Sequence, residues 1–156
     1  MQYLLLIYGS EMAWDKIPKD ELGKMYGEYT AFTKAIAASG NYIGGNPLQP
    51  TSTATTVRVR DGKRSVTDGP FAETKELVAG FWIWQVRNIE EAVEWLKRSP
   101  FGPGAELEIR PIFEAADFGA HLTPELKAHQ DHLREQVADK QSSKPRKKSF
   151  DALSIL

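Results

Sequence analysis

Residues 66–86 read VTDGPFAETKELVAGFWIWQV, a short acidic turn followed by a strongly apolar run. We predict that the apolar run is a β-strand. Successive side chains of a strand point to opposite faces, so Phe81 and Ile83 lie on one face and Trp82 and Trp84 on the other. An antiparallel sheet with helices on one side usually keeps its second face polar. Both faces of this strand are apolar, so both need a cover.

The turn before this strand contains Asp68, whose carboxylate is hard to place by turn geometry alone. An aspartate often closes a turn by accepting a hydrogen bond from the backbone N–H two residues on, but that residue is Pro70, which has no N–H. The carboxylate must therefore bond the Phe71 N–H, water, a distant group or a ligand. Asp68 is thus a candidate functional residue, with a role in fixing the loop as the alternative.

The composition is typical of one soluble globular domain: 156 residues, 41% hydrophobic and 26% charged. The absence of cysteine excludes disulfides, thiolate metal sites and cysteine nucleophiles, and it fits a reducing cytoplasm. The longest apolar run, Tyr3–Tyr8, is too short to cross a membrane and follows no basic signal segment. We expect a cytoplasmic protein that does not associate with membranes.

The net charge of −1 is unevenly distributed along the chain. Residues 140–149 carry five basic residues and no acidic one, which leaves −6 on the remaining residues. An acidic globule with a short basic tail is a poor candidate for nucleic-acid binding through its fold. The tail itself has the composition of a flexible segment.

Periodicity divides the chain into alternating strands and helices. Asp61-Gly62 is a strong two-residue hairpin turn, Gly40 sits where a left-handed helix cap belongs, and Thr123-Pro124 begins a third helix. The predicted elements are a strand over 2–8, a helix over 20–39, a loop or short irregular strand pair over 41–52, hairpin strands over 53–60 and 63–67, the aromatic strand, a helix from Asn88 to before Pro100, a strand over 106–112 and a helix from Thr123.

This order of elements predicts a ferredoxin-like α+β fold if the hairpin merges with its neighbours: an antiparallel sheet with both helices on one face. A second copy packing on the uncovered face would bury the other side of the aromatic strand. We therefore predict a homodimer with two sheets face to face and a cavity between sheet, hairpin and partner. Residues 1–114 are the predicted domain, residues 115–139 a C-terminal helical extension and residues 140–156 a basic, flexible tail.

Several stretches resemble the DGPF branch of the YCII-related family. They are Tyr3–Tyr8, Gly44–Leu48 with Thr55, Val57 and Arg58, the long motif Thr67–Glu76, and Arg110-Pro111-Ile112. The resemblance covers roughly residues 1–114 and implies the dimeric α+β barrel fold, with a function that is mostly unknown in the family. Relatives include a dehydrochlorinase of ring-cleavage products. DGPF proteins are also often encoded beside extracytoplasmic-function sigma factors, which implies a regulatory role.

The resemblance also brings a proposed active site, a His–Asp pair, from which this chain departs. Its histidines, His121, His129 and His132, lie beyond the matched region, so that pair is not transferred. Only the aspartate of that pair has a counterpart in this chain, and the motif match assigns it to Asp68.

Two carboxylates and two arginines are the candidates for chemistry. We predict that Asp68, and secondarily Glu73, lie as paired carboxylates in the cavity, where Phe71 or Trp82 would desolvate one of them and raise its pKa toward a value useful for a general acid or base.

Arg58 and Arg110 lie on the polar faces of their strands. They would clamp an anionic substrate with forked hydrogen bonds, and Phe71 and Trp82 are the further predicted substrate contacts. The alternative is that they solvate edge strands or pair with Glu106 or Glu108.

Cofactors and metals find no support in the sequence. Glu125, His129 and His132 share one helix face, but two histidines three residues apart on a polar helix are usually solvated. No glycine pattern matches a dinucleotide or phosphate-binding loop. The matched region contains no histidine that could ligate haem iron. We expect a protein that binds or transforms a small anionic metabolite. The alternative is a non-catalytic regulatory partner that binds another protein through its third helix and tail.

Overall fold

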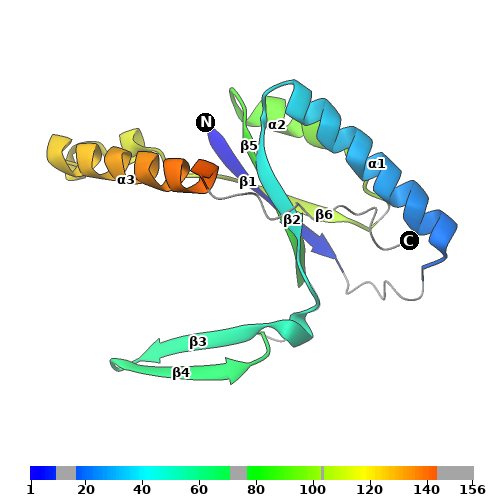
Figure 1. The fold of residues 1–156 in the computed structure, drawn as a ribbon, viewed down its shortest axis with the longest axis horizontal. Helices are drawn as coiled ribbons and strands as arrows, with labels where there is room; N and C mark the ends of the chain where they lie inside the picture. The colour runs from blue at the N-terminus through cyan, green and yellow to red at the C-terminus, as the bar shows by residue number, and fades with distance from the viewer. Residues whose placement is uncertain (10–16, 71–76, 103, 144–156) are drawn as a thin grey trace. The chain divides into compact units, whose positions relative to one another are not determined.

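A computed structural model describes residues 1–9, 17–70, 77–102 and 104–143 (Figure 1). The chain forms two compact units, Met1–Ile112 and Phe113 onward. The first unit contains every described strand, two α-helices and a short 3-10 segment, η2 (Thr51–Thr53). The second contains a 3-10 segment, η3 (Ala115–His121), and the helix α3 (Pro124–Ser143). The predicted boundary at residue 139 remains a prediction, and α3 continues past it.

The main sheet has four antiparallel strands in the order β2-β5-β1-β6 (Figure 1). The strands are β1 (Gln2–Gly9), β2 (Tyr42–Pro47), β5 (Leu77–Gln85) and β6 (Glu106–Pro111). The first strand in sequence is therefore central, between the aromatic strand and β6. Together with its helices, this sheet has the mixed α+β, ferredoxin-like architecture predicted from the sequence.

Two helices pack on one face of this sheet, which we call the inner face (Figure 1). They are α1 (Lys19–Ala38) and α2 (Ile89–Leu96). Beyond the end of α1, Gly40 takes the predicted left-handed conformation at φ +79°. At the start of α2, Asn88 Oδ1 accepts a hydrogen bond from the Glu91 N–H at 3.0 Å, as its cap pattern predicts. Glu91 Oε2 in turn accepts from the Arg87 N–H at 2.8 Å, one residue before the expected position.

The core lies on the inner face and is largely aromatic. The Trp82 ring stacks on Trp84 with centroids 5.4 Å apart, and Phe32 of α1 lies 5.4 Å from Trp82. Such ring pairs add stability beyond the area that they bury. The buried core residues are Tyr3, Leu5, Phe32, Ile36, Trp82, Trp84, Val86 and Ala92.

The edge strand β2 differs from the loop or irregular pair predicted for residues 41–52. Glycine and proline are poor strand residues, yet Gly44, Gly45 and Pro47 pair with β5. A Cβ on Gly45 would lie 2.2 Å from Cδ1 of Trp82, so a side chain there would collide with the indole. The glycine allows the backbone of β2 to pass directly over a buried tryptophan.

The hairpin strands β3 (Thr55–Arg60) and β4 (Lys63–Asp68) form a separate two-stranded sheet. Asp61 and Gly62 have φ of +50° and +74°, which confirms the predicted turn between them. We expected the hairpin to merge with its neighbours, but it stays separate from the main sheet. The reason is that β5 already pairs with β1 and β2 along its two edges.

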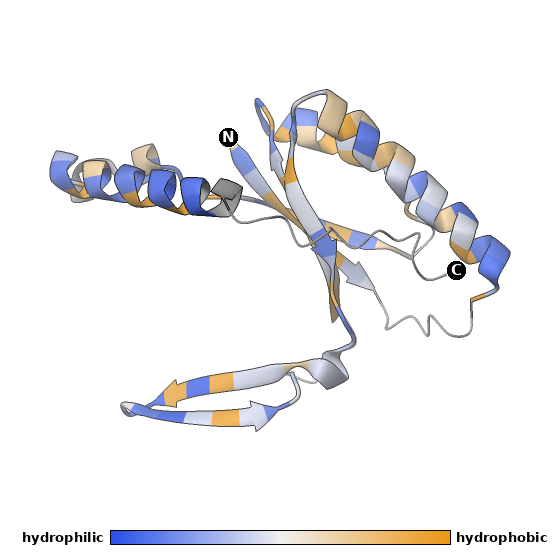
Figure 2. Cartoon of the chain, viewed as in Figure 1, coloured by the Kyte–Doolittle hydropathy of each residue, from blue (hydrophilic) through white to orange (hydrophobic). Residues whose placement is uncertain are grey.

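The helix α3 begins at its predicted cap, where Thr123 Oγ1 accepts a hydrogen bond from the Leu126 N–H at 3.3 Å. Its residues are mostly hydrophilic (Figure 2). Among the helices of the described residues, none combines the length and apolar character needed to cross a bilayer.

Candidate functional site

The face of the sheet opposite α1 and α2, here the outer face, carries a strip of apolar side chains. The register places Leu4 opposite Ile83 and Leu6 opposite Phe81. Along β5, Phe81 and Ile83 alternate with the tryptophans of the inner face. All four side chains are partly exposed, in contrast to the buried residues of the inner face. The predicted two-sided apolar character of β5 is confirmed. A polar ligand alone would not suit this strip, whereas a second apolar surface or the apolar part of a ligand would.

A polar cluster lies beside this strip on the same face. In β6, Glu108 pairs with Leu6 and Arg110 with Leu4, so both side chains belong to the outer face. The Glu108 carboxylate accepts a hydrogen bond from Tyr8 Oη at 2.9 Å through Oε2, and a second from Arg110 Nε through Oε1. We call Tyr8, Glu108 and Arg110 the outer-face cluster.

The electrostatics of the cluster favour its ionised form. The hydrogen bond from Arg110, followed by that from Tyr8, holds the pKa of Glu108 below its ordinary value, and the Glu108 carboxylate raises the pKa of Arg110. The Arg110 side chain remains 63% exposed. Its guanidinium therefore keeps solvent access while Glu108 fixes its orientation, an arrangement suited to a second anion.

Arg110 is a residue predicted from the sequence, and Glu108 is its predicted alternative partner, whereas no sequence pattern indicates Tyr8 as a site residue. The ion pair with Glu108 is present. The sequence does indicate the face on which Tyr8 lies. Leu4, Leu6 and Tyr8 are two residues apart on one strand, so their side chains share a face. The pairing of β1 with β6 was needed to bring Tyr8 to Glu108.

The hairpin holds two further predicted residues, Asp68 and Arg58, on its opposite faces. Asp68 lies opposite Thr55 at the end of β4, and Arg58 of β3 lies opposite Ser65. Because Thr55 and Arg58 are three residues apart on one strand, the Asp68 and Arg58 side chains belong to opposite faces of the hairpin. One hairpin therefore does not bring them together. The turn after β4 is fastened through Gly69, whose N–H donates to Ala54 O at 2.7 Å and whose carbonyl accepts from Thr56 Oγ1 at 2.7 Å. Among the described residues, Asp68 makes no hydrogen bond or ion pair.

The remaining predicted residues lie elsewhere. Trp82 is 7% exposed and packs in the inner-face core, on the opposite side of the sheet from the cluster. Its role as a ligand contact remains a prediction. Phe71 and Glu73 lie outside the described residues, so their predicted roles stay predictions as well.

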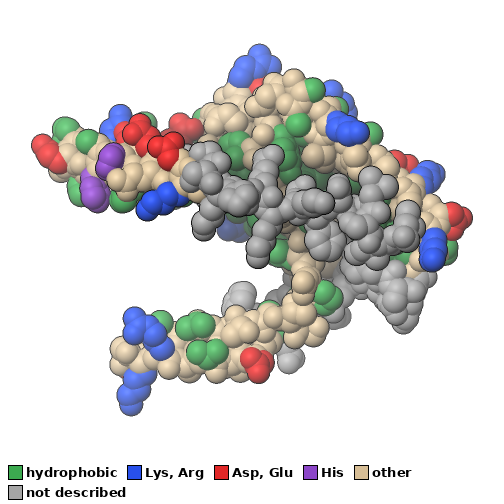
Figure 3. Space-filling model, in the orientation of Figure 1, with side chains coloured by type: hydrophobic (Ala, Val, Ile, Leu, Met, Phe, Trp, Pro, Cys, Tyr) green, Lys and Arg blue, Asp and Glu red, His purple; other side chains and the backbone are tan. Residues whose placement is uncertain are grey.

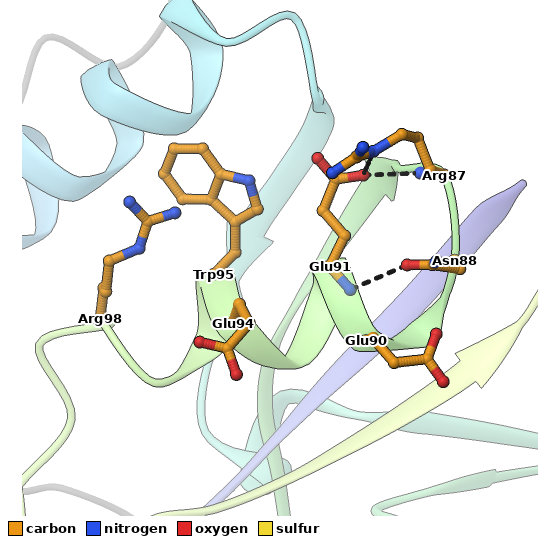
Figure 4. Close-up of a pocket in the computed structure, with 7 residues that line it drawn as sticks. All are labelled: Arg87, Asn88, Glu90, Glu91, Glu94, Trp95 and Arg98. Carbon is orange, nitrogen blue, oxygen red and sulfur yellow. Dashed lines mark hydrogen bonds and ion pairs between the residues drawn. The ribbon is translucent and has the colours of Figure 1, made fainter.

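A surface hollow of about 420 Å³ runs along α2 (Figure 4). Its charged lining is largely paired: Arg87 bonds Glu91 at 2.9 Å, and Arg98 lies 3.7 Å from the centre of the Trp95 ring. Hydrogen bonds from Arg87, with a smaller one from Asn41, hold the pKa of Glu91 below its ordinary value. None of the described residues predicted to be functional lines this hollow. The pairing of its charges is typical of a solvated helix surface rather than of a ligand site.

Comparison with known proteins agrees with the resemblance noted in the sequence. A family model described as YCII-related domain matches residues 1–116. An uncharacterised protein of Rhizobium meliloti (strain 1021) is 31% identical over 114 residues, which is 72% of this chain and 92% of that relative. The family match includes every strand that builds the outer-face cluster.

Proposed function

This chain belongs to the YCII-related family, and from that premise we propose that it binds or transforms a small anionic metabolite as a homodimer, in a cavity between the outer face and the partner subunit. The observation that carries this proposal is the position of Arg110. Its exposed guanidinium stands beside an apolar strip and is oriented by Glu108. A small molecule with a carboxylate and an apolar body matches both features.

The homodimer follows from the apolar strip on the outer face. Leaving Leu4, Leu6, Phe81 and Ile83 in water is unfavourable by about 25 cal/mol for each Å² of apolar surface. A second copy of the chain would cover this strip in a two-fold arrangement. The same packing would exclude water from Arg110 and strengthen its attraction for an anion.

Asp68 is the proposed acid or base of any reaction in this cavity. Its carboxylate is exposed and makes no bond to another described residue, so it is available to a substrate that reaches it. If Asp68→Asn leaves dimer stability, ligand retention and turnover of the retained ligand unchanged, Asp68 has no such role.

Native mass spectrometry of the purified protein tests the proposed function. We expect two chains with a retained small molecule, and loss of that molecule in Arg110→Ala with the dimer intact. A charge-assisted hydrogen bond contributes about 1.5–3 kcal/mol, which corresponds to a roughly 10- to 100-fold weaker affinity. Arg87→Ala is the matched control, because Arg87 is an exposed arginine that pairs with a glutamate of α2. A monomer, or equal ligand retention by both variants, contradicts the proposal.

A second candidate function, a non-catalytic regulatory partner of an extracytoplasmic-function sigma factor, draws support from α3. Leu126, Leu133 and Val137 are 45–53% exposed and fall on one stripe of the helix. At 3.6 residues per turn, Arg134 and Lys140 flank this stripe, whereas Asp131, Glu135 and Asp139 lie on the far side. An acidic, partly apolar protein surface would match this face.

Charge reversal on the two faces of α3 tests the second candidate. Arg134→Glu should abolish co-purification with a co-expressed extracytoplasmic-function sigma factor from the same organism, and Glu135→Arg, on the far side of the same turn, should retain it. If both variants co-purify with that sigma factor as the unmodified chain does, α3 is not the binding surface.

A further inference from the structure

The hairpin exposes its apolar face to solvent. Register places Val57, Val59 and Val66 on one face, here the valine face, together with Arg64 and Asp68. These valines are 60%, 62% and 68% exposed. On the other face, Thr56 and Arg58 are partly buried.

Figure 3 shows the hydrophobic side chains gathered over the middle of the hairpin, with basic side chains at its turn and an acidic one at the other end. Three valines in contact with water on a two-stranded sheet are unfavourable, since such a sheet has marginal stability by itself. Every residue of β4 is exposed. A cover for the valine face is therefore expected in the functional protein.

The outer face of the main sheet has the complementary properties. Its apolar strip consists of residues two apart on adjacent strands, as does the valine face. In both patches, neighbouring side chains are therefore spaced about 6–7 Å apart along a strand and about 5 Å apart between strands. The hairpin, residues 55–68, carries four basic and two acidic residues, a net +2, against −3 on the rest of the chain. Beside the strip lie Glu106 and Glu108.

We propose that the valine face of each hairpin packs on the outer face of the partner subunit and carries Asp68 and Arg64 into the partner's cavity. This inference rests on the homodimer of the proposed function and specifies its geometry. The site then combines Tyr8, Glu108 and Arg110 of one subunit with two hairpin residues of the other. Arg58 points away from it, in contrast to its predicted role as an anion clamp.

The composite site defines the ligand class more closely. Arg110 and Arg64 supply cationic donors from two subunits, so the preferred ligand is an anion with two acidic groups or one delocalised acidic group. Asp68, brought next to such a ligand, is the group placed to exchange a proton with it. Neither subunit alone contains the whole set.

Cross-linking of engineered cysteines tests this geometry, because the chain itself has none. Val66→Cys and Ile83→Cys are introduced into separate full-length chains, of which one carries a size tag, and the two are co-expressed. We expect a disulfide between chains of different size under mild oxidation. Ser65→Cys is the matched control for Val66→Cys, since the neighbouring residue is also exposed but belongs to the other hairpin face. It should give little of this product.

Light scattering on the same samples separates the outcomes. A dimer in which Val66→Cys links no better than Ser65→Cys overturns the hairpin inference and leaves the homodimer standing. A monomer overturns both. A disulfide formed only within one chain, when both cysteines are placed in the same chain, also overturns the inference.

Charge substitution provides a second readout that does not depend on disulfide geometry. Val66→Asp should raise the dissociation constant of the dimer at least tenfold, whereas Ser65→Asp should leave it within twofold. Equal effects of the two substitutions would contradict the proposal. Far-ultraviolet circular dichroism of both variants should match that of the unmodified chain, because both positions are exposed.

Discussion

Gly45 lies against the indole of Trp82 so closely that a single added carbon would stand 2.2 Å from Cδ1. The indole cannot retreat, since it stacks on Trp84 and packs against Phe32. We predict that Gly45→Ala lowers the free energy of unfolding by about 1–3 kcal/mol through overpacking. Urea unfolding followed by tryptophan fluorescence measures this change.

The control for this prediction is Gly44→Ala on the same strand, where an added Cβ meets nothing within 4 Å. Its effect should stay within about 0.5 kcal/mol, as at other open sites. Equal losses at both positions would mean that the strand itself rejects a side chain, and that contact with Trp82 is not the cause.

A second prediction concerns the ionisation of Glu108. The Arg110 and Tyr8 hydrogen bonds lower its folded-state pKa, so they stabilise the fold above the ordinary glutamate pKa, and this contribution is lost as the pH falls through the lowered value. Arg110→Ala should therefore raise the Glu108 pKa toward its ordinary value. Carbon-detected NMR titration of the side-chain carboxyl measures both values. Tyr8→Phe should give a smaller shift in the same direction.

A third prediction concerns the cap of α2. Replacing Asn88 with alanine removes the bond to the Glu91 N–H and should destabilise the fold by about 1 kcal/mol. Asn88→Asp keeps an acceptor and should be nearly neutral. Thermal unfolding of the two variants compares them. If Asn88→Asp loses as much stability as Asn88→Ala, the side-chain oxygen is not the stabilising group.

A fourth prediction separates local from global stability. Gly62 has φ +74°, which disfavours a side chain by about 1–2 kcal/mol. Gly62→Ala should accelerate hydrogen exchange at the amides of β3 and β4. It should leave exchange in β1 and β5 unchanged at concentrations where the protein is monomeric, because the hairpin is a separate sheet. Faster exchange throughout the main sheet would show that the two sheets unfold together.

Most of the fold could be predicted from the sequence because its signals are local. Helix caps at Asn88 and Thr123, the Asp61-Gly62 turn and the alternation in β3 act within a few residues, and each has its predicted conformation. The strand β2, predicted only as a loop or short irregular strand pair, could not be assigned to the main sheet for a non-local reason. Its glycines disfavour a strand by propensity, and the need for Gly45 becomes clear only from the indole of Trp82 on the neighbouring strand.

The candidate site was harder to predict because it depends on strand pairing. Arg110 was identified by its residue type, but its orientation follows from Glu108, and that of Glu108 from Tyr8, about a hundred positions earlier in the chain. The face of the strand on which each side chain lies also decides which predicted site residues can come into contact. Asp68 and Arg58 are both predicted site residues, and the register of the hairpin places them on opposite faces.

The position of β1 has a consequence for biosynthesis. This strand is made first, yet its neighbours are β5, beginning at Leu77, and β6, which ends at Pro111. A nascent chain on the ribosome thus presents the run Tyr3–Ile7 without its hydrogen-bonding partners until most of the unit has left the exit tunnel. Translation pauses before Leu77 would prolong this interval and increase the need for a chaperone that holds apolar segments.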